Sequence, residues 1–454
     1  MTPPATTTDD IGLRFMLLGL LALAASLAFG ALGAVKFLDP DFLEALPFHK
    51  VRPLHVSLAV SWIFLAAIGG IYHHLHKGGG PALFSPRAAA WHFRLFAVTG
   101  IAILGAYLAG RFGGREYWEF PPVLSLPIFA SWILFGWNYF RSVLRRRGAW
   151  PVYYWMWGTG IVFFLITFSE AHLWLIPFFR ENMVREVTVQ WKAYGALVGS
   201  WNMLVYGTAI LVMEKISGDE TLAASKLAFS LFFLGLFNLM FGWAHHAYPV
   251  PAAPWIRHFA YVVSMTELLV LGKIIWDWRG TVATWRRFRH RDACRFLFAA
   301  DLWVFLNLLL AIVISIPAAN LFTHGTHVTV AHAMGTTIGI NTMILLASVF
   351  YVIETRASEA AARRYRTAVR AGFWLTNGAL LAFFLALIGA GLVRGTFAGS
   401  FAEMTAAVAP WLVVFTVAGV GLMAGLWMIL LPATRTIWGL VAPRRRAIAP
   451  SAAE

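Results

Sequence analysis

Cysteine is nearly absent from the sequence, because Cys294 is the only one in 454 residues. A single cysteine excludes an internal disulfide, a CxxCH attachment site for c-type haem and a cysteine-rich metal cluster within this chain. Any redox chemistry must therefore rest on histidine, methionine and cofactors that are held without a covalent link to cysteine.

Charge is scarce as well, since only 13% of the residues are charged while 59% are hydrophobic. Soluble domains carry about 25% charged residues, which excludes a soluble enzyme of this length. The first apolar run, residues 13–35, is too long for the core of a signal peptide and has no clear cleavage site. We therefore expect a multi-pass membrane protein without a cleavable signal.

Long apolar runs are what the sequence has in abundance. Each is close to the roughly 20 residues that a helix needs to cross a bilayer. Runs of this length without alternation predict helices, because only helices and closed barrels satisfy the backbone in lipid. We expect one all-α integral membrane domain over residues 1–454. Its twelve transmembrane helices should lie near residues 13–36, 53–75, 91–110, 121–140, 152–178, 191–213, 224–246, 258–277, 295–318, 327–352, 371–392 and 407–431.

The net charge of +15 comes from basic residues in the short loops between these runs. Of the 36 lysines and arginines, 26 fall at the termini and in the even-numbered loops. By the positive-inside rule, both termini are cytoplasmic. This distribution favours topology signals and contacts with anionic lipids over nucleic-acid binding.

Polar donors from four predicted helices fall at a similar depth, in the outer half of the membrane. His55 opens the second helix, and His245 and His246 close the seventh. His332 lies in the first turns of the tenth helix, and Asn202 lies within the sixth. Imidazoles on separate helices suit axial haem ligands and ligands of a nonhaem metal. Any single one could instead be a hydrogen-bonded histidine inside the bundle.

Four motifs carry a resemblance to a known family. They are RPLH (52–55), GREYWE (114–119), AHHAY (244–248) and THGTHVTVAHAM (323–334). With them the chain resembles catalytic subunits of the haem–copper oxidase superfamily, and within it most closely the nitric oxide reductase branch (its cytochrome b chain). The resemblance covers all twelve helices. It implies a bundle that holds a low-spin haem b beside a high-spin haem b, which faces a nonhaem metal, usually iron, or copper in the oxidase branches.

The resemblance also implies roles for individual histidines. His55 would be an axial ligand of the low-spin haem, and His332 would be the proximal ligand of the high-spin haem. His245 and His246 would hold the nonhaem metal. His324 and His327 are not spaced like the family's ligand pair and would contact propionates or the outer surface.

Charged residues near this centre receive roles in the same way. Glu116 would match a glutamate that helps to bind calcium between haem propionates. Glu267 would match a carboxylate near the nonhaem metal, although a glutamate paired with a neighbouring helix is the alternative. Arg52, Arg115 and Arg394 could neutralise propionates or serve as snorkelling anchors.

Three positions depart from the family pattern. Asn202 stands where the family has a third histidine on the nonhaem metal, and an amide oxygen suits iron better than copper. One turn later, Tyr206 stands where reductases have a glutamate; it either delivers a proton or an electron or is simply a buried tyrosine. Met334 takes the second axial position of the low-spin haem. His/Met ligation raises the reduction potential, whereas a packing role would leave that haem five-coordinate or absent.

These expectations favour a respiratory enzyme of a bacterial-type inner membrane that reduces NO to N2O, with Glu267 as proton donor and Tyr206 as a candidate second donor. Rival interpretations are an oxygen-reducing terminal cytochrome oxidase, an NO dismutase, and a haem-binding NO/O2 sensor or electron relay without catalysis. The electron donor must be a partner subunit, a cytochrome c or a quinol, since no dicopper motif is present. The inner halves of the helices contain few ionisable residues, of which Lys273 is the notable one. A complete proton channel from the inner side is therefore not expected, and we expect protons to enter from outside.

Overall fold

The computed structural model describes residues 10–248, 250, 251, 253–266, 272 and 290–442. The regular structure of this part is helical apart from an isolated bridge between Arg115 and Trp118. Eleven of its helices are long and apolar enough to cross a membrane. The predicted helix near 258–277 lies largely outside the described residues, but its described start, 254–266, is helical. The all-helical membrane fold is therefore confirmed.

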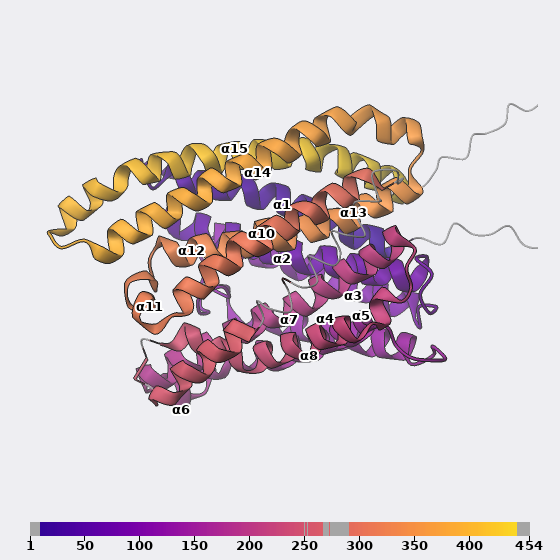
Figure 1. The fold of residues 1–454 in the computed structure, drawn as a ribbon, viewed down its shortest axis with the longest axis horizontal. Helices are drawn as coiled ribbons and strands as arrows, with labels where there is room; N and C mark the ends of the chain where they lie inside the picture. Colours follow the sequence, from indigo (N-terminus) through magenta and orange to yellow (C-terminus); the bar gives the residue numbers. More distant parts are fainter. Residues whose placement is uncertain (1–9, 249, 252, 267–271, 273–289, 443–454) are drawn as a thin grey trace, which may run out of the picture.

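The spanning elements follow one another along the chain (Figure 1). In order, they are α1 (Ile11–Val35), α2 (Phe48–His76), α3 (Pro86–Leu108), η1 (Pro122–Leu124) with α4 (Ser125–Val143), α5 (Val152–Glu170) with η2 (Leu173–Leu175), α7 (Met183–Ser217), α8 (Lys226–Phe241) with η4 (Gly242–Ala247), α10 (Arg291–Ser315), α12 (His327–Met334) with η6 (Gly335–Thr342) and α13 (Met343–Arg356), α14 (Glu359–Thr396) and α15 (Phe401–Val441).

Short helices mark one end of the bundle. Helix α6 (Pro177–Arg180) connects α5 to α7, and α11 (Pro317–Thr323) connects α10 to α12. In Figure 1 both lie at the end where α14 turns into α15. All three connections are odd-numbered loops in the predicted topology, so this end is the predicted outer end and is called the outer end from here on.

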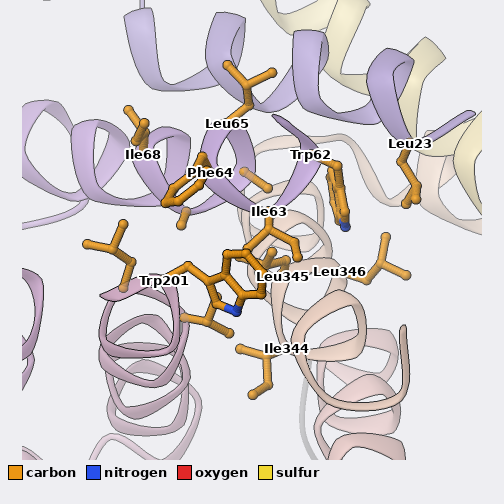
Figure 2. Close-up of a cluster of buried hydrophobic side chains, with 14 of the residues drawn as sticks. Leu23, Trp62, Ile63, Phe64, Leu65, Ile68, Trp201, Ile344, Leu345 and Leu346 are labelled. Carbon is orange, nitrogen blue, oxygen red and sulfur yellow. The ribbon is translucent and has the colours of Figure 1, made fainter. Parts of the chain in front are cut away.

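Three spans form the centre of the bundle. In the apolar 18-residue stretch of each helix, buried residues make up 67% in α2, 72% in α7 and 78% in the span from α12 to α13, against 28% in α3. Figure 2 shows where these helices meet: Trp62 of α2, Trp201 of α7 and Ile344 of α13 share one apolar cluster. Because α2, α7 and α12 also carry His55, Asn202 and His332, the candidate ligands are anchored on the most deeply buried part of the fold.

The span from α12 to α13 contains a π-helix, η6, between these two helices. Its Gly339 packs against α10 so closely that an added Cβ would lie 2.5 Å from Cγ of Trp303. At the end of η6, the Thr342 hydroxyl donates to the carbonyl of Thr337 at 2.8 Å and accepts from Nε1 of Trp62 at 3.0 Å. π-helical stretches are rare in proteins, and those that occur are frequently at functional sites.

Candidate active site

His55 lies where α2 faces α1, and its ring is oriented by Ser26. Nδ1 of His55 is 2.8 Å from the carbonyl oxygen of Ser26, while the Ser26 hydroxyl donates to the carbonyl of His55 at 3.0 Å. A carbonyl oxygen only accepts, so the proton sits on Nδ1 and Nε2 keeps its lone pair. This is the arrangement of a metal-ligating histidine whose other nitrogen is held by the backbone.

Gly30 of α1 leaves room for this ring. A Cβ at Gly30 would lie 2.7 Å from Cε1 and 2.8 Å from Nδ1 of His55. Real side chains do not approach so closely, so the imidazole occupies the space that the glycine leaves. The position of His55 therefore depends on α1 at two points, Ser26 and Gly30.

His332 and Met334 lie on α12 and leave the helix in nearly opposite directions, because two residues span about 200° of an α-helix. Nδ1 of His332 is buried without a hydrogen-bond partner among the described residues, an arrangement that a bound metal ion or haem iron fits. The carbonyl of His332 accepts from Thr336, whose hydroxyl in turn accepts from Asn307 at 2.7 Å. Met334 is half buried against the main core, and its role as a haem ligand stays a prediction.

A cavity of about 200 Å³ separates α7, α8 and α10. Asn202 and Tyr206 line it from one face of α7, as their i, i+4 spacing predicts. Asn238 of α8 and Asp301 of α10 line the same cavity, whose remaining walls are largely apolar. Sequence reasoning missed both, although an acidic residue inside the apolar run 295–318 was a signal for Asp301.

The amide of Asn202 is engaged by the π-helix. Nδ2 of Asn341 donates to Oδ1 of Asn202 at 3.2 Å, and Asn341 is fully buried. The oxygen that would bind a metal therefore points at a protein group. Whether Asn202 is a metal ligand stays a prediction.

The remaining predicted metal ligands cannot be placed by their side chains. The backbone of His245 and His246 forms part of the 3₁₀-helix η4, at the outer end of α8. Their side chains, and all of Glu267, lie outside the described residues. Within the described part of the chain, no three His, Cys, Asp or Glu side chains come together as a metal site.

Arg52 joins two glutamates at the outer end of α2. Its Nη2 is 2.6 Å from Oε1 of Glu116, and its Nη1 is 2.7 Å from Oε1 of Glu119. Oε2 of Glu119 is buried and has no hydrogen-bond partner among the described residues. Glu116, predicted to help to bind calcium, is thus paired with an arginine that was predicted to neutralise propionates. Both roles stay predictions.

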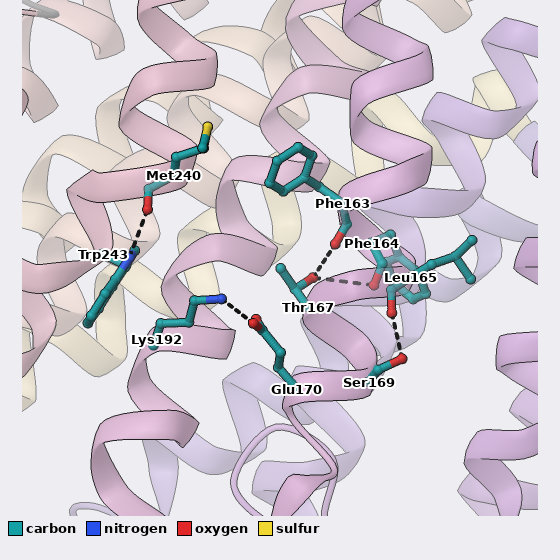
Figure 3. A network of polar contacts seen from close by, with 9 residues as sticks. All are labelled: Phe163, Phe164, Leu165, Thr167, Ser169, Glu170, Lys192, Met240 and Trp243. Atoms are coloured by element: carbon teal, nitrogen blue, oxygen red, sulfur yellow. Dashed lines mark hydrogen bonds and ion pairs between the residues drawn. The ribbon is translucent and has the colours of Figure 1, made fainter. Parts of the chain in front are cut away.

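Of the other two predicted arginines, Arg115 pairs with a different glutamate. Nε of Arg115 is 2.6 Å from Oε1 of Glu186, and its guanidinium lies 4.1 Å from the ring centroid of Trp174. Arg394 lies in the last turn of α14, at the outer end. Figure 3 shows a further ion pair on the outer side, between Glu170 of α5 and Lys192 of α7. These pairs leave the outer end of the bundle rich in charge.

Two histidines at the inner end of α2, His73 and His74, have protein partners instead. Nδ1 of His73 is 2.8 Å from Oδ2 of Asp10, which is also 3.2 Å from Nη1 of Arg356. Nε2 of His74 is 2.9 Å from the hydroxyl of Tyr154. Burial alone would raise the pKa of Asp10, but the hydrogen bond and charge of His73 and the charge of Arg356 lower it overall. These contacts form an interfacial polar cluster at this end of the bundle.

Known proteins share this fold and part of this sequence. The sequence pattern of the family described as cytochrome c and quinol oxidase polypeptide I matches residues 10–421. A nitric oxide reductase chain of Stutzerimonas stutzeri is 23% identical over 416 residues, which cover 84% of this chain and 83% of the reductase chain. A cytochrome c oxidase subunit 1 homolog of Agrobacterium tumefaciens (strain T37) is 22% identical over 90% of this chain and 80% of the homolog.

Among solved structures, a haem–copper terminal oxidase dimer determined by cryo-EM has the same fold. The TM-score is 0.77 at 15% identity, and the match covers 96% of this chain and 84% of the oxidase chain. The chain therefore belongs to the cytochrome c and quinol oxidase polypeptide I family and is a multi-pass oxidoreductase of the haem–copper oxidase superfamily in a bacterial-type inner membrane.

Proposed function

We propose that the chain is a nitric oxide reductase-like catalytic subunit, which converts two NO, two electrons and two protons into N2O and water. One observation carries the choice of NO over dioxygen: the face of α7 that lines the cavity offers an amide, Asn202, where the family has a third imidazole. A site with few imidazole ligands binds copper weakly, so nonhaem iron suits this site better. The similarity to a nitric oxide reductase chain supports the same choice.

The described residues fit two haems b. Nε2 of His55 is free to bind a low-spin haem, with Met334 as the second axial ligand. His332 would hold a high-spin haem. When bound, the haems supply electron transfer, and the high-spin haem together with a nonhaem iron at His245 and His246 brings two NO molecules close together.

The protein supplies orientation and protons. Ser26 and Gly30 fix the ring of His55, as described above. Arg52, paired with Glu116 and Glu119, would neutralise propionates, and Glu116 would share a calcium ion with them. Glu267 and Tyr206 would give protons to the oxygen atom that leaves as water. We propose that these protons enter from the outer side, where charged residues gather.

The electrons must come from outside this chain. A partner subunit, a cytochrome c or a membrane quinol would deliver them to the haem at His55, which lies near the outer end of α2. The sequence offers no covalent haem site, which supports a separate donor.

A second candidate function is the reduction of dioxygen to water. Tyr206 favours it, because a phenol that lines the cavity can supply both a proton and an electron, and the similarity to the Agrobacterium oxidase homolog agrees. An NO dismutase would use the same site without an external electron donor. A sensor or electron relay would keep the haems and lack turnover.

One assay separates these functions. The purified, reduced protein is mixed with NO in the absence of air while N2O and dioxygen are both followed, and the iron and copper content is measured per haem. We expect rapid loss of NO, with N2O as the only product and nonhaem iron in the protein. Release of dioxygen would assign a dismutase. Copper with fast dioxygen reduction would assign an oxidase, and NO binding without turnover would assign a sensor or relay.

A further inference from the structure

Asn202 and Asn341 form an amide pair between α7 and the π-helix η6. The distance from Nδ2 of Asn341 to Oδ1 of Asn202 is 3.2 Å. Asn202 lines the cavity between α7, α8 and α10. From the segment that carries Asn341, the described lining residues are Ile340 and Ile344, so Asn341 stands behind the cavity wall.

The polarity of this pair, meaning which amide donates the hydrogen bond, decides whether the oxygen or the NH2 group of Asn202 faces the cavity. An asparagine side chain ends in one acceptor oxygen and one NH2 group that donates two hydrogen bonds. Because the oxygen of Asn202 points at Asn341, its NH2 group is the end that remains for the cavity. The site on α7 therefore presents hydrogen-bond donors rather than a metal-binding oxygen.

The neighbours of Asn341 hold this polarity in place. The next residue, Thr342, is fixed by hydrogen bonds to Trp62 and Thr337. Two residues earlier, Gly339 lies directly against Trp303. With the backbone fixed on both sides, Asn341 acts as a rigid support for the amide of Asn202.

We propose that Asn202 is a hydrogen-bond donor to the diatomic substrate and that Asn341 is the positioning residue that sets its direction. The proposal rests on the function proposed above and assigns its cavity a specific chemistry. Joining two NO molecules after electron transfer places negative charge on their oxygen atoms, and a fixed donor stabilises such charge. The nonhaem metal would then be left with His245 and His246 and without an amide ligand.

The opposite polarity has a distinct signature. Oδ1 of Asn341 is buried and has no hydrogen-bond partner among the described residues. If both amides turned, Nδ2 of Asn202 would donate to that oxygen, and Oδ1 of Asn202 would face the cavity as a metal ligand. Donor and ligand roles therefore predict different results for the same variants.

The test uses two substitutions, with carbon monoxide as a spectroscopic probe on the reduced, full-length protein. Asn341→Leu removes the donor that holds Oδ1 of Asn202, so the amide of Asn202 is free to turn. Asn202→Leu removes both ends of the amide at similar volume. Ser348→Ala, which deletes a buried hydroxyl on α13, is the matched control. Metal per haem, the C–O stretching frequency and NO turnover are measured for each.

If Asn202 donates, both variants keep their nonhaem metal and shift the C–O stretch to higher frequency, since a hydrogen bond to the oxygen end weakens that bond. NO turnover then falls by about 10²–10³-fold, as after loss of an oxyanion donor. Loss of metal in Asn202→Leu with normal haem content would overturn the proposal, as would an unchanged C–O stretch in both variants. If the native protein consumed no NO, the proposed function would fail while the C–O stretch still decided the polarity.

Discussion

Nδ1 of His55 and the carbonyl oxygen of Ser26 lie 2.8 Å apart, so the first transmembrane helix orients a ring that the second one carries. Helices α1 and α2 therefore form one functional unit. A change in α1 that moves the ring should act on the low-spin haem and leave the rest of the centre intact.

Gly30→Ala tests this unit directly. The new Cβ would overlap the ring of His55, whose Cε1 lies 2.7 Å from its position, so the ring must move. We expect the low-spin haem to be lost or bound about 10–100-fold more weakly, with the high-spin haem retained. Reduced-minus-oxidised spectra and haem content per protein measure the effect.

Gly33→Ala is the matched control on the same helix. Its Cβ would meet Cγ1 of Val51 at 3.6 Å, which is ordinary van der Waals contact. This variant should keep the native spectrum. An equal loss of haem in both variants would mean that α1 merely tolerates no alanine, and the specific role of Gly30 would be wrong.

Met334→His tests the sixth ligand of the low-spin haem. If the thioether binds iron, imidazole in its place keeps the haem low-spin and lowers its reduction potential, because His/Met ligation gives the higher potential. Redox titration of the haem bands measures the shift. Met334→Leu should convert the same haem to a high-spin form, and an unchanged spectrum in that variant would show that Met334 only packs.

Tyr206→Phe tests proton delivery into the cavity. Loss of a positioned proton donor should lower NO turnover by about 10²–10⁴-fold while haem and metal content stay constant. Tyr194→Phe is the control, because the buried Tyr194 hydroxyl on the same helix has no hydrogen-bond partner among the described residues. Equal turnover in both variants would leave Tyr206 as a packing residue.

Asp10→Asn tests the inner polar cluster through pH. The folded pKa of Asp10 is lowered, so its charge stabilises the fold above the unfolded pKa of about 4 and stops doing so as pH falls through the folded value. Asparagine keeps the helix cap that Asp10 provides to Gly12. We expect the variant to lose about 1.5–3 kcal/mol at neutral pH, as for hydrogen bonds to charged groups.

Thermal melting of both forms in detergent measures this difference. The gap between the native protein and Asp10→Asn should be constant from neutral pH down to about pH 5 and should close at lower pH. A gap that widens on acidification would contradict the assigned charge. Asp10→Ala, which also removes the cap, should cost about 1 kcal/mol more at every pH.

Much of the fold follows from the sequence, because the length of each apolar run is set by the bilayer rather than by neighbouring helices. The helices that carry His55 and Asn202 could be predicted for the same reason. Their partners could not: Ser26 is a common residue in an apolar helix, and its contact with His55 depends on how α1 and α2 pack. Asn341 likewise contacts α7 from a π-helix, η6, and no sequence pattern indicated that helix type.

The outer loop gives a similar contrast. The motif GREYWE predicts a role for Glu116 but none for Glu119, because the contact of Glu119 with Arg52 depends on the turn between the two glutamates. Tyr117 adopts a positive φ of 67° there, a conformation that side chains rarely take. The turn brings both carboxylates to Arg52, 64 and 67 residues away in sequence.

The ion pair between Asp10 and Arg356 joins the start of α1 to the end of α13, 346 residues later. At roughly 5–20 residues synthesised per second, the ribosome reaches Arg356 about 20–70 s after Asp10. During that interval α1 resides in the membrane with its buried aspartate bound to His73 but not yet to Arg356. Two further contacts of α1 form later still, because α15 binds the carbonyls of Ala24 and Ala34 through Trp427 and Thr416. The surroundings of α1, the first helix to be synthesised, are therefore completed only when α15 has been inserted.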